Sequence, residues 1–397
     1  MMMNSILSLT ETAASGAAWD NVLIGAFIVL LAAICLYAAV IPQGGRGWWG
    51  LTILTGLLTI AGMAVSGEWT RILLLDLAAF GAVALVWIDP DPQAKSAARL
   101  YLSMLVAAVI LIALGVYLGG EGSQQPAGIS AKLAAACLIA GFSLKLALVP
   151  FYFWLPKVAG NVKPMTSVMI VSIVDIAAFS ELAAMRLTIP WLFTQYGTIW
   201  LVLALLSMFI GALLALAQTN IKSLLAYSTI DDMGYLVLGV LAGSQVGLSG
   251  AILAALSHAF FKFLLFASVG VAENKLGHAV TLKDRGLAAR FPVSAAVFIL
   301  SAIGMIGVPP LFGFIGRWRL YLSGVQLGGA ALALTMAAAT ALALLYYVRA
   351  IHRVWLGKPE EEVQPQEPLL ARLVLIVVLV ALLLVGLFPA WLTALIG

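Results

Sequence analysis

Long apolar stretches recur along almost the whole chain, and they constrain the fold more than any other feature. Windows of about 20 apolar residues, the length needed to cross a bilayer as a helix, predict twelve membrane spans. Hydrophobic residues make up 63% of the 397 and charged residues only 10%, with a mean hydropathy of +1.10. Soluble domains carry about 25% charged residues, so this composition excludes a water-soluble globular protein. The predicted spans are 22–41, 48–66, 70–88, 99–119, 132–155, 165–187, 197–217, 222–242, 248–272, 292–316, 325–350 and 370–394.

The connections between these spans are short, so we expect one helical bundle embedded in the lipid bilayer, without a separate soluble domain. Lysine and arginine concentrate in the connections after odd-numbered spans, for example Lys157, Lys163 and Arg285. The positive-inside rule therefore predicts a bacterial-type inner (plasma) membrane protein with both termini on the outer, periplasmic side. Residues 1–20 lack the basic start and early apolar core of a cleaved signal peptide, so we expect the first span to remain.

Two predicted spans are interrupted at corresponding places. The fifth contains Pro150 and Pro156, and the tenth contains Gly307, Pro309 and Pro310. A proline can simply kink a membrane helix, but paired interruptions five spans apart favour two inverted repeats with a site near the midplane. We therefore predict an all-α polytopic protein of about twelve transmembrane helices, with two inverted five-helix repeats that each contain a broken helix. The predicted parts are 1–47 (N-terminal segment and first span), 48–188 and 189–353 (the repeats), and 354–397 (polar connection and last span).

A small set of ionisable residues lies within the apolar spans, where each would be costly if it faced lipid. We expect them to converge on a hydrated interior. Lys145 stands deep in the fifth span, five residues before Pro150, and Asp76, which also lies near mid-span, is the first candidate partner of opposite charge. The plainer alternatives are that Lys145 snorkels to the surface, or that the pair only holds two helices together. The set consists of Asp76, Lys145, Asp175, Glu181, Asp231, Asp232, His258, Lys262 and Arg317.

His258 and Lys262 are four residues apart, so they share one helix face and are placed to pass a proton along it. His258 could equally serve packing by donating to a backbone carbonyl. Asp231 and Asp232 are adjacent and point to different faces, so we expect at most one of them to line a path. Arg317 follows the second break, and we expect it near the membrane exit, where it stays protonated and biases its neighbours.

Metal, redox and nucleophilic sites are not suggested by the sequence. Cys35 and Cys137 both lie in apolar spans, and the three histidines are far apart. Motifs that attach haem, hold iron–sulfur clusters or cradle nucleotide phosphates are absent. We expect no cofactor, no metal and no nucleic-acid partner for this chain, and any redox chemistry would belong to other subunits.

Four segments resemble one known family. Lys145-Leu-Ala-Leu-Val-Pro-Phe-Tyr-Phe-Trp-Leu-Pro156 is similar to the lysine-bearing broken helix of the antiporter-like subunits of respiratory complex I. Residues 220–235 resemble that family's DIKRLLAYSSISHMGY stretch, 258–266 its HAFFKALLF helix, and 307–317 its second broken helix. The HAFFK form is typical of the L and M subunits and of Mrp antiporters, whereas the second break has the N-subunit form. The resemblance covers residues 70–350.

The resemblance implies fourteen helices, two inverted five-helix repeats and a horizontal chain of charged residues that conducts protons. Twelve predicted spans are two fewer than this, with the difference near the N-terminus. Lys145 takes the place of the central lysine and Asp76 that of its glutamate partner. Lys262 and His258 fall on the second lysine and its preceding histidine, and Arg317 falls on the exit residue.

Three positions depart from the family. Asp175 stands where the linking helix has a lysine or histidine, and the alignment there needs one extra residue. Asp231 lies in a region where histidine is common, and Arg317 replaces a residue that can release its proton. The linking base has become an acid, which weakens the expectation of a complete proton wire.

The sequence thus predicts a proton-translocating, antiporter-like subunit of a complex I-like NADH (or other donor):quinone oxidoreductase, with a path through Asp76, Lys145, Asp175, His258, Lys262 and Arg317. Such a subunit acts as part of a redox-driven translocase and has no redox site of its own. Other membrane subunits would be its partners, and these would hold the iron–sulfur clusters, flavin and quinone. Two alternatives stay open: a cation/proton antiporter module of Mrp or membrane-hydrogenase type, and a non-conducting subunit that bridges its neighbours.

Overall fold

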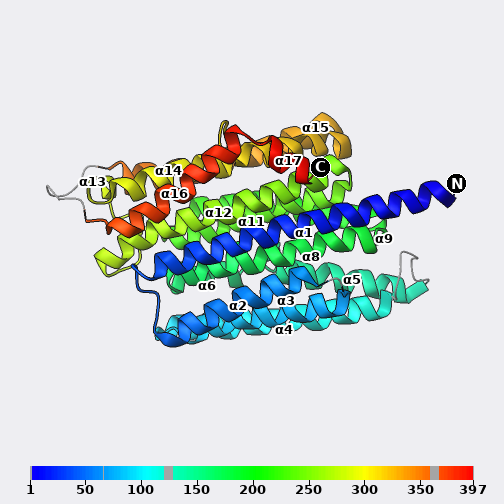
Figure 1. Ribbon diagram of the computed structural model, residues 1–397, viewed down its shortest axis with the longest axis horizontal. Coiled ribbons are helices and arrows are strands. Elements are labelled where there is room, and N and C mark those ends of the chain that lie inside the picture. Colours follow the sequence, from blue (N-terminus) through cyan, green and yellow to red (C-terminus); the bar gives the residue numbers. More distant parts are fainter. Residues whose placement is uncertain (1, 66, 120–127, 358–365, 397) are drawn as a thin grey trace.

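The described part of the chain is helical, with no strand, in a computed structural model that covers all residues except 1, 66, 120–127, 358–365 and 397 (Figure 1). Two short π-helices, η1 and η2, interrupt the α-helices. The elements are α1 (Met2–Ala38), α2 (Arg46–Ala64), α3 (Glu68–Trp87), α4 (Pro92–Gly119), α5 (Gly128–Lys145), α6 (Trp154–Asn161), α7 (Pro164–Val168), η1 (Met169–Val174), α8 (Asp175–Thr188), α9 (Trp191–Gln195), α10 (Gly197–Ala217), α11 (Ile221–Ala242), α12 (Gln245–Leu276), α13 (Leu287–Arg290), α14 (Pro292–Ile306), α15 (Gly313–Ala350), η2 (Ile351–Trp355), α16 (Leu369–Leu387) and α17 (Ala390–Ile396).

Eleven helical segments of the described residues are long and apolar enough to cross a membrane, and α14 is a shorter apolar helix. The α15 segment doubles back at Gly328 and Gly329, whose backbones are not helical. Tyr321 and Thr340, 19 residues apart, are joined by a 2.6 Å hydrogen bond, which a straight helix would not allow. With α14 and the first part of α15 counted as one broken span, the twelve predicted passes are confirmed.

Both predicted breaks are present, and they fall at comparable points of the two spans. Helix α5 ends at Lys145, and the chain resumes as α6 at Trp154 after a left-handed residue, Ala147, with φ of 51°. Helix α14 ends at Ile306, and Gly307, with φ of 86°, leads to α15. The first break exposes the Leu144 carbonyl, which accepts a 3.1 Å hydrogen bond from the Trp154 indole. A left-handed residue therefore makes the turn at each break, and at the first break a side chain also satisfies a freed carbonyl group.

The helices on either side of each break pack in the same order. In 48–188, α2 contacts α3, α3 contacts α4, and α4 contacts the broken helix α5–α6. In 197–350, α10 contacts α11, α11 contacts α12, and α12 contacts the broken helix α14–α15. Because each set crosses the membrane five times, the second set begins on the opposite side from the first. This is the arrangement of inverted repeats that the paired breaks predict.

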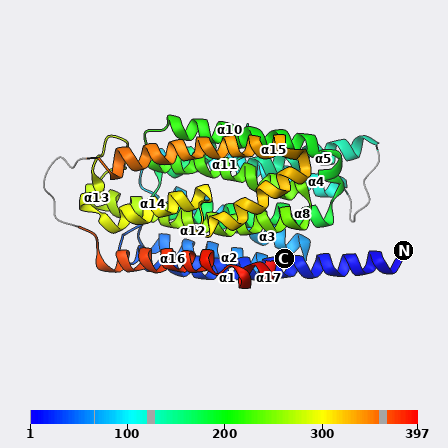
Figure 2. The ribbon, with the colours of Figure 1, turned by 90° about the horizontal axis from the view of Figure 1, so that it is seen from above.

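The interior of the bundle is formed by three spans, 164–188, α11 and α12 (Figures 1 and 2). These are 94%, 94% and 89% buried, against about a third to a half for the others. They carry six of the nine ionisable residues singled out from the sequence. A straight apolar helix, α1, lies along the outside and reaches α12 through a 2.7 Å hydrogen bond from Tyr37 to the Ala267 carbonyl. At the middle of α1, the Trp19 indole donates to the Ile396 carbonyl at 2.8 Å, so the C-terminal helix α17 lies beside α1 there.

Candidate functional site: two buried charge clusters

The first cluster is a triad at the end of α5. Lys145 Nζ lies 2.7 Å from Asp76 Oδ1 on α3 and 2.7 Å from Glu181 Oε2 on α8. All three residues are buried. Lys145 is the last residue of α5, so its side chain lies at the break, in the interior of the bundle. The predicted Asp76–Lys145 contact is confirmed.

Glu181 gives this triad an excess of acid. With every group ionised, two carboxylates and one ammonium leave a formal charge of −1 within hydrogen-bond reach of one another. One glutamate oxygen, Oε1, is buried without a hydrogen-bond partner. A buried uncompensated charge is costly, so an arrangement of this kind favours binding and release of one proton among the three groups. The triad can therefore act as a proton-holding site.

The second cluster surrounds Asp232 on α11. Its Oδ1 accepts a 2.8 Å ionic hydrogen bond from Arg317 Nη2, and its Oδ2 lies 3.3 Å from His258 Nδ1. Arg317 also donates to the Met305 carbonyl at 3.0 Å, and its guanidinium lies over the Tyr235 ring, 3.8 Å from the centroid. These three groups bury Arg317 within the cluster, and its expected place near the membrane exit stays a prediction. Since arginine keeps its proton, the groups here that can titrate are the Asp232 carboxyl group and the His258 imidazole.

The two clusters repeat one pairing. In each set of five spans, an aspartate on the second helix binds a cation on the broken fourth helix: Asp76 with Lys145 at 2.7 Å, and Asp232 with Arg317 at 2.8 Å. The lysine precedes its break and the arginine follows it. Both ion pairs therefore lie near the breaks of inverted helices, which is where broken membrane helices form ion sites.

Lys262 lies between α11 and α12 with uncharged partners. Its Nζ donates to the Leu225 carbonyl at 2.7 Å and contacts Ser228 Oγ, which also accepts a 3.3 Å hydrogen bond from Tyr347. His258, four residues earlier, reaches Asp232 instead, so these two side chains of one helix bind different partners. Direct transfer along the helix face is therefore not how the structure connects them.

Asp231 and Asp232 both bind polar groups in the interior, and the expectation that at most one of them lines a path stays a prediction. Asp231 Oδ2 accepts a 3.1 Å hydrogen bond from Tyr346, whose ring lies against that of Tyr347, 4.6 Å between centroids. The adjacent aspartates thus point to different neighbours, as helical geometry predicts, and each finds a polar group. Asp231 joins the Lys262 side of the network and Asp232 the Arg317 side.

Asp175 lies beside the first cluster. It is the first residue of α8, directly after the π-helix η1, and it is buried. Asp175 and Lys145 line the same small cavity, about 10 Å³, together with Tyr101 and Trp154. That volume is close to the smallest that holds a water molecule. Asp175, which departs from the family pattern, therefore lies where its carboxyl group and one water molecule could exchange protons with the triad.

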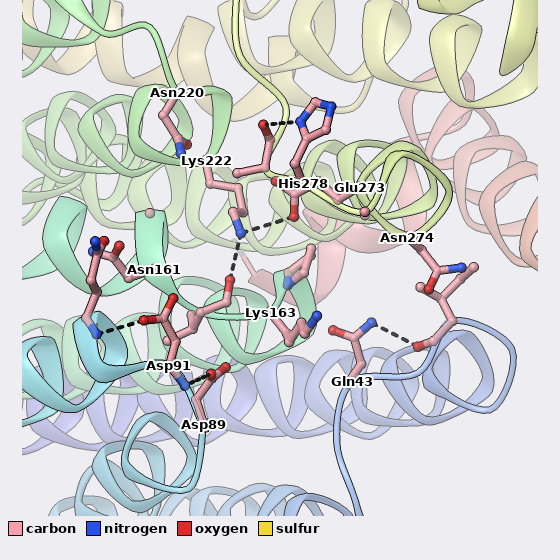
Figure 3. Close-up of a pocket in the computed structure, with 18 of the residues that line it drawn as sticks. Gln43, Asp89, Asp91, Asn161, Lys163, Asn220, Lys222, Glu273, Asn274 and His278 are labelled. Atoms are coloured by element: carbon pink, nitrogen blue, oxygen red, sulfur yellow. Dashed lines mark hydrogen bonds and ion pairs between the residues drawn. The ribbon is translucent and has the colours of Figure 1, made fainter. Parts of the chain in front are cut away.

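A polar pocket of about 750 Å³ opens at the end of the bundle where the odd-numbered connections meet (Figure 3). At its wall, Lys222 Nζ lies 3.0 Å from Glu273 Oε2 and donates to the Val162 carbonyl at 2.8 Å. Lys222 lies six residues before Ser228 on α11, about 9 Å along the helix axis. The pocket thus reaches toward the Lys262 network from one end of the bundle.

Sequence reasoning missed the roles of several residues that complete these clusters. Glu181 was recognised as buried and ionisable, but spacing alone did not place it on the face of α8 that meets Lys145. Ser228, Tyr346 and Tyr347 are uncharged and gave no signal. Lys222 and Glu273 stand near span ends, where charged residues are ordinary. In the part of the chain that the structure describes, no three metal-ligating side chains cluster closely enough to hold a metal ion, and both cysteines are free.

Comparison with known proteins identifies the same family that the four sequence segments resemble. The family model for "NADH:quinone oxidoreductase/Mrp antiporter, TM" matches residues 101–343. NADH-quinone oxidoreductase subunit N of Moorella thermoacetica is 28% identical over 384 residues, covering 92% of this chain and 80% of that protein. NAD(P)H-quinone oxidoreductase subunit 2 of Synechococcus elongatus is 30% identical over 358 residues, covering 84% and 68%.

Solved structures share the fold. A chain of the Mrp complex from Dietzia sp. superposes with a TM-score of 0.87 at 20% identity, covering 96% of this chain and 82% of that one. A chain of respiratory complex I from Thermus thermophilus superposes with a TM-score of 0.80 at 24% identity, covering 94% and 85%. At these identities, the superpositions are evidence for the helical architecture alone.

Proposed function

This chain belongs to the NADH:quinone oxidoreductase/Mrp antiporter transmembrane family, and from that premise we propose that it is a proton-translocating membrane subunit of a complex I-like oxidoreductase. Its matched relatives are subunits of NADH- or NAD(P)H-quinone oxidoreductases. As a subunit of such an assembly, it would move protons while other subunits carry out the redox reaction. The chain itself would have no redox site, and flavin, iron–sulfur clusters and quinone would reside in its partners.

The observation that carries the proposal is the pair of buried charge clusters at the two broken helices. Isolated charges inside a membrane protein are expensive, so evolution retains them where ions move. Here an ammonium group lies 2.7 Å from each of two carboxylates, and a histidine lies 3.3 Å from a third. Hydrogen-bonded acids and bases at these separations can exchange protons without large movements of the helices.

The roles within the path follow from chemistry. Asp76 and Lys145 would respond to the partner's redox reaction by changing which of them holds the proton. Asp175 would relay between the triad and Lys262, which releases its proton through Ser228. At the far cluster, His258 accepts and releases the proton, because Arg317 keeps its own and only sets the electrostatic potential around Asp232.

The proposed orientation follows the charge distribution. The polar pocket and the basic connections would face the cytoplasm, and both termini would face the periplasm. Other membrane subunits would cover parts of the bundle, and lipid would cover the rest.

A second candidate is a cation/proton antiporter module of Mrp or membrane-hydrogenase type. The His258–Lys262 segment, whose HAFFK form is shared with Mrp antiporters, favours it. This function predicts transport that depends on sodium and a set of partners without iron–sulfur proteins. A third candidate, a non-conducting bridging subunit, is favoured by the acid at position 175 and the fixed charge at position 317.

Co-purification separates these functions. The tagged protein would be extracted in mild detergent, and its partners identified by mass spectrometry. Partners with iron–sulfur and quinone-binding motifs are expected from a redox-driven pump. Recovery of only small antiporter-type membrane proteins, with sodium-dependent transport in vesicles, would contradict the main proposal and support the second candidate.

A further inference from the structure

We propose that Glu181, Arg71 and Asp20 form a gated proton route from the Lys145 triad to the end of the bundle that carries the termini. The inference rests on the proposed proton-translocating function and adds a second opening to the path. It assigns a role to Glu181 as a proton carrier and to the Arg71–Asp20 ion pair as a gate.

The route begins at Glu181, which faces two ways. Its Oε2 accepts a 2.7 Å hydrogen bond from Lys145, while its Oε1 is buried without a partner. The preceding residue, Ser180, accepts a 3.3 Å hydrogen bond from Arg71 Nη2. Glu181 therefore contacts Lys145 on one side, and its neighbour Ser180 contacts Arg71 on the other.

Arg71 is held by a two-pronged ion pair. Its Nη1 lies 2.6 Å from Asp20 Oδ2, and its Nη2 lies 3.0 Å from Asp20 Oδ1. This geometry fixes the guanidinium plane and anchors it to α1. Asp20 lies on α1, away from the helices of Arg71 and Glu181. Release of this ion pair would leave the Arg71 side chain with only its 3.3 Å hydrogen bond to Ser180 and its 3.5 Å contact with Met63 Sδ.

Exposure to solvent rises steadily along these residues. The side chain of Glu181 is 4% exposed, that of Arg71 is 13%, and that of Asp20 is 25%. Arg71 lies in the first turn of α3, and α8 ends at Thr188, two turns after Glu181, so α3 begins and α8 ends at the same end of the bundle. That end also holds the middle of α1, beside the C-terminal helix α17. The three residues therefore lead from the interior to this surface.

The proton moves in two balanced steps. First, an N–H bond of the Lys145 ammonium breaks and an O–H bond forms on Glu181, which leaves a neutral amine and a neutral carboxylic acid. Glu181 then gives the proton to water or to the Asp20 carboxylate, and its own charge is restored. Arg71 keeps its proton throughout, because arginine does not titrate in this range. Its fixed positive charge opposes the passage of another cation, so the route is closed while Asp20 holds it in place.

The test measures passive proton permeability in sealed vesicles that contain the purified complex, without redox substrate. A pH-sensitive dye reports proton uptake after an acid jump. The Asp20→Asn variant should release Arg71 and raise the permeability on the order of tenfold over the wild type, equivalent to about 1.4 kcal/mol less cost of opening. The double variant Asp20→Asn/Glu181→Gln should return to the wild-type rate, because the carrier is missing. Asp91→Asn, an exposed aspartate at the opposite end, is the matched control.

Two results would overturn the route: wild-type permeability in Asp20→Asn, or a leak that persists when Glu181 is also replaced. If Asp20→Asn does not assemble, Arg71→Gln opens the same gate and carries the same expectations. Redox-driven transport by a Lys145→Ala variant separates this from the proposed function. Normal transport by that variant removes the proposed function itself, whereas lost transport together with a silent Asp20→Asn removes only the outer route.

Discussion

Replacing Asp232 by asparagine should destabilise the protein much more than the same replacement of Asp76. Both aspartates lie mid-span, both are buried, and each binds a cation at 2.7–2.8 Å. The difference lies in what the cation has left. Without Asp76, Lys145 still has Glu181 at 2.7 Å, and the formal charge of the triad falls from −1 to 0. Without Asp232, Arg317 retains only the Met305 carbonyl and the Tyr235 ring in direct contact.

The magnitudes follow from these contacts. Removing one partner of a buried ion pair and leaving the other charge uncompensated costs about 3–5 kcal/mol, which is the expectation for Asp232→Asn. Asp76→Asn keeps a hydrogen-bond acceptor of the same shape and leaves no uncompensated cation, so its cost is about 1–2 kcal/mol, the value of a weakened hydrogen bond. The gap between the two variants should therefore be about 1–4 kcal/mol.

The assay is thermal denaturation of the detergent-solubilised protein carrying a fluorescent fusion, followed by size-exclusion chromatography of the surviving fraction. Asp232→Asn should lose its monodisperse peak at a clearly lower temperature than Asp76→Asn, and the latter should stay close to the wild type. Equal midpoints, or a lower midpoint for Asp76→Asn, would refute the reasoning that Glu181 is a second counter-ion of Lys145.

Two further predictions use the same thermal assay. Gly211→Ala should destabilise the protein by about 1–3 kcal/mol through overpacking, because the added Cβ would lie 2.6 Å from the backbone nitrogen of Asp231. Its control, Gly25→Ala, should be neutral, because a Cβ at Gly25 meets nothing within 4 Å. Equal midpoints for the two variants would show that α10 and α11 are not in close contact at Gly211. Lys222→Met should lower the stability of the protein by about 1–3 kcal/mol, since it leaves Glu273 without its 3.0 Å partner and removes the hydrogen bond to the Val162 carbonyl. Its control, replacement of the exposed Lys283 by methionine, should have little effect. An unchanged midpoint for Lys222→Met would mean that the ion pair does not stabilise the wall of the pocket.

The overall fold was accessible from sequence because membrane spans have a strong one-dimensional signal. Length and hydropathy alone predict the twelve passes, and the prolines and glycines mark the two breaks. The return at Gly328 and Gly329 lies just inside the predicted span 325–350, so that span begins a few residues later than expected. The first helix differs from its predicted span, 22–41, because α1 begins at Met2 and so includes an N-terminal segment that is not strongly apolar.

The site was predictable only where charge was the signal. Asp76 and Lys145 were paired because each is an isolated ion near the middle of a span, where a partner is nearly obligatory. The partners of Arg317 were not predicted, because Asp232 and the Tyr235 ring lie on another helix. Glu181 was seen but not placed, because helical spacing gives a residue's face and not the neighbour that the face meets.

The uncharged groups of the network and the polar pocket were beyond the reach of sequence patterns. Ser228 and Tyr347 look like any other polar residues in membrane helices until the structure brings Lys262 against them. The pocket arises from five connections that are far apart along the chain, and no single one of them shows a signature. These features depend on how helices pack, which hydropathy does not encode.

The most direct test of the account is the number of protons translocated per electron by the purified complex in proteoliposomes, measured for Lys145→Arg and Lys145→Ala against the wild type. Lys145→Arg keeps the charge between Asp76 and Glu181 but does not release a proton, so it tests conduction without removing the ion pairs. The exposed Lys132 on the same helix, changed to alanine, is the control. We predict fewer protons per electron for both Lys145 variants and a wild-type value for Lys132→Ala. A wild-type ratio in both assembled Lys145 variants would contradict the claim that this chain conducts protons through its buried charges.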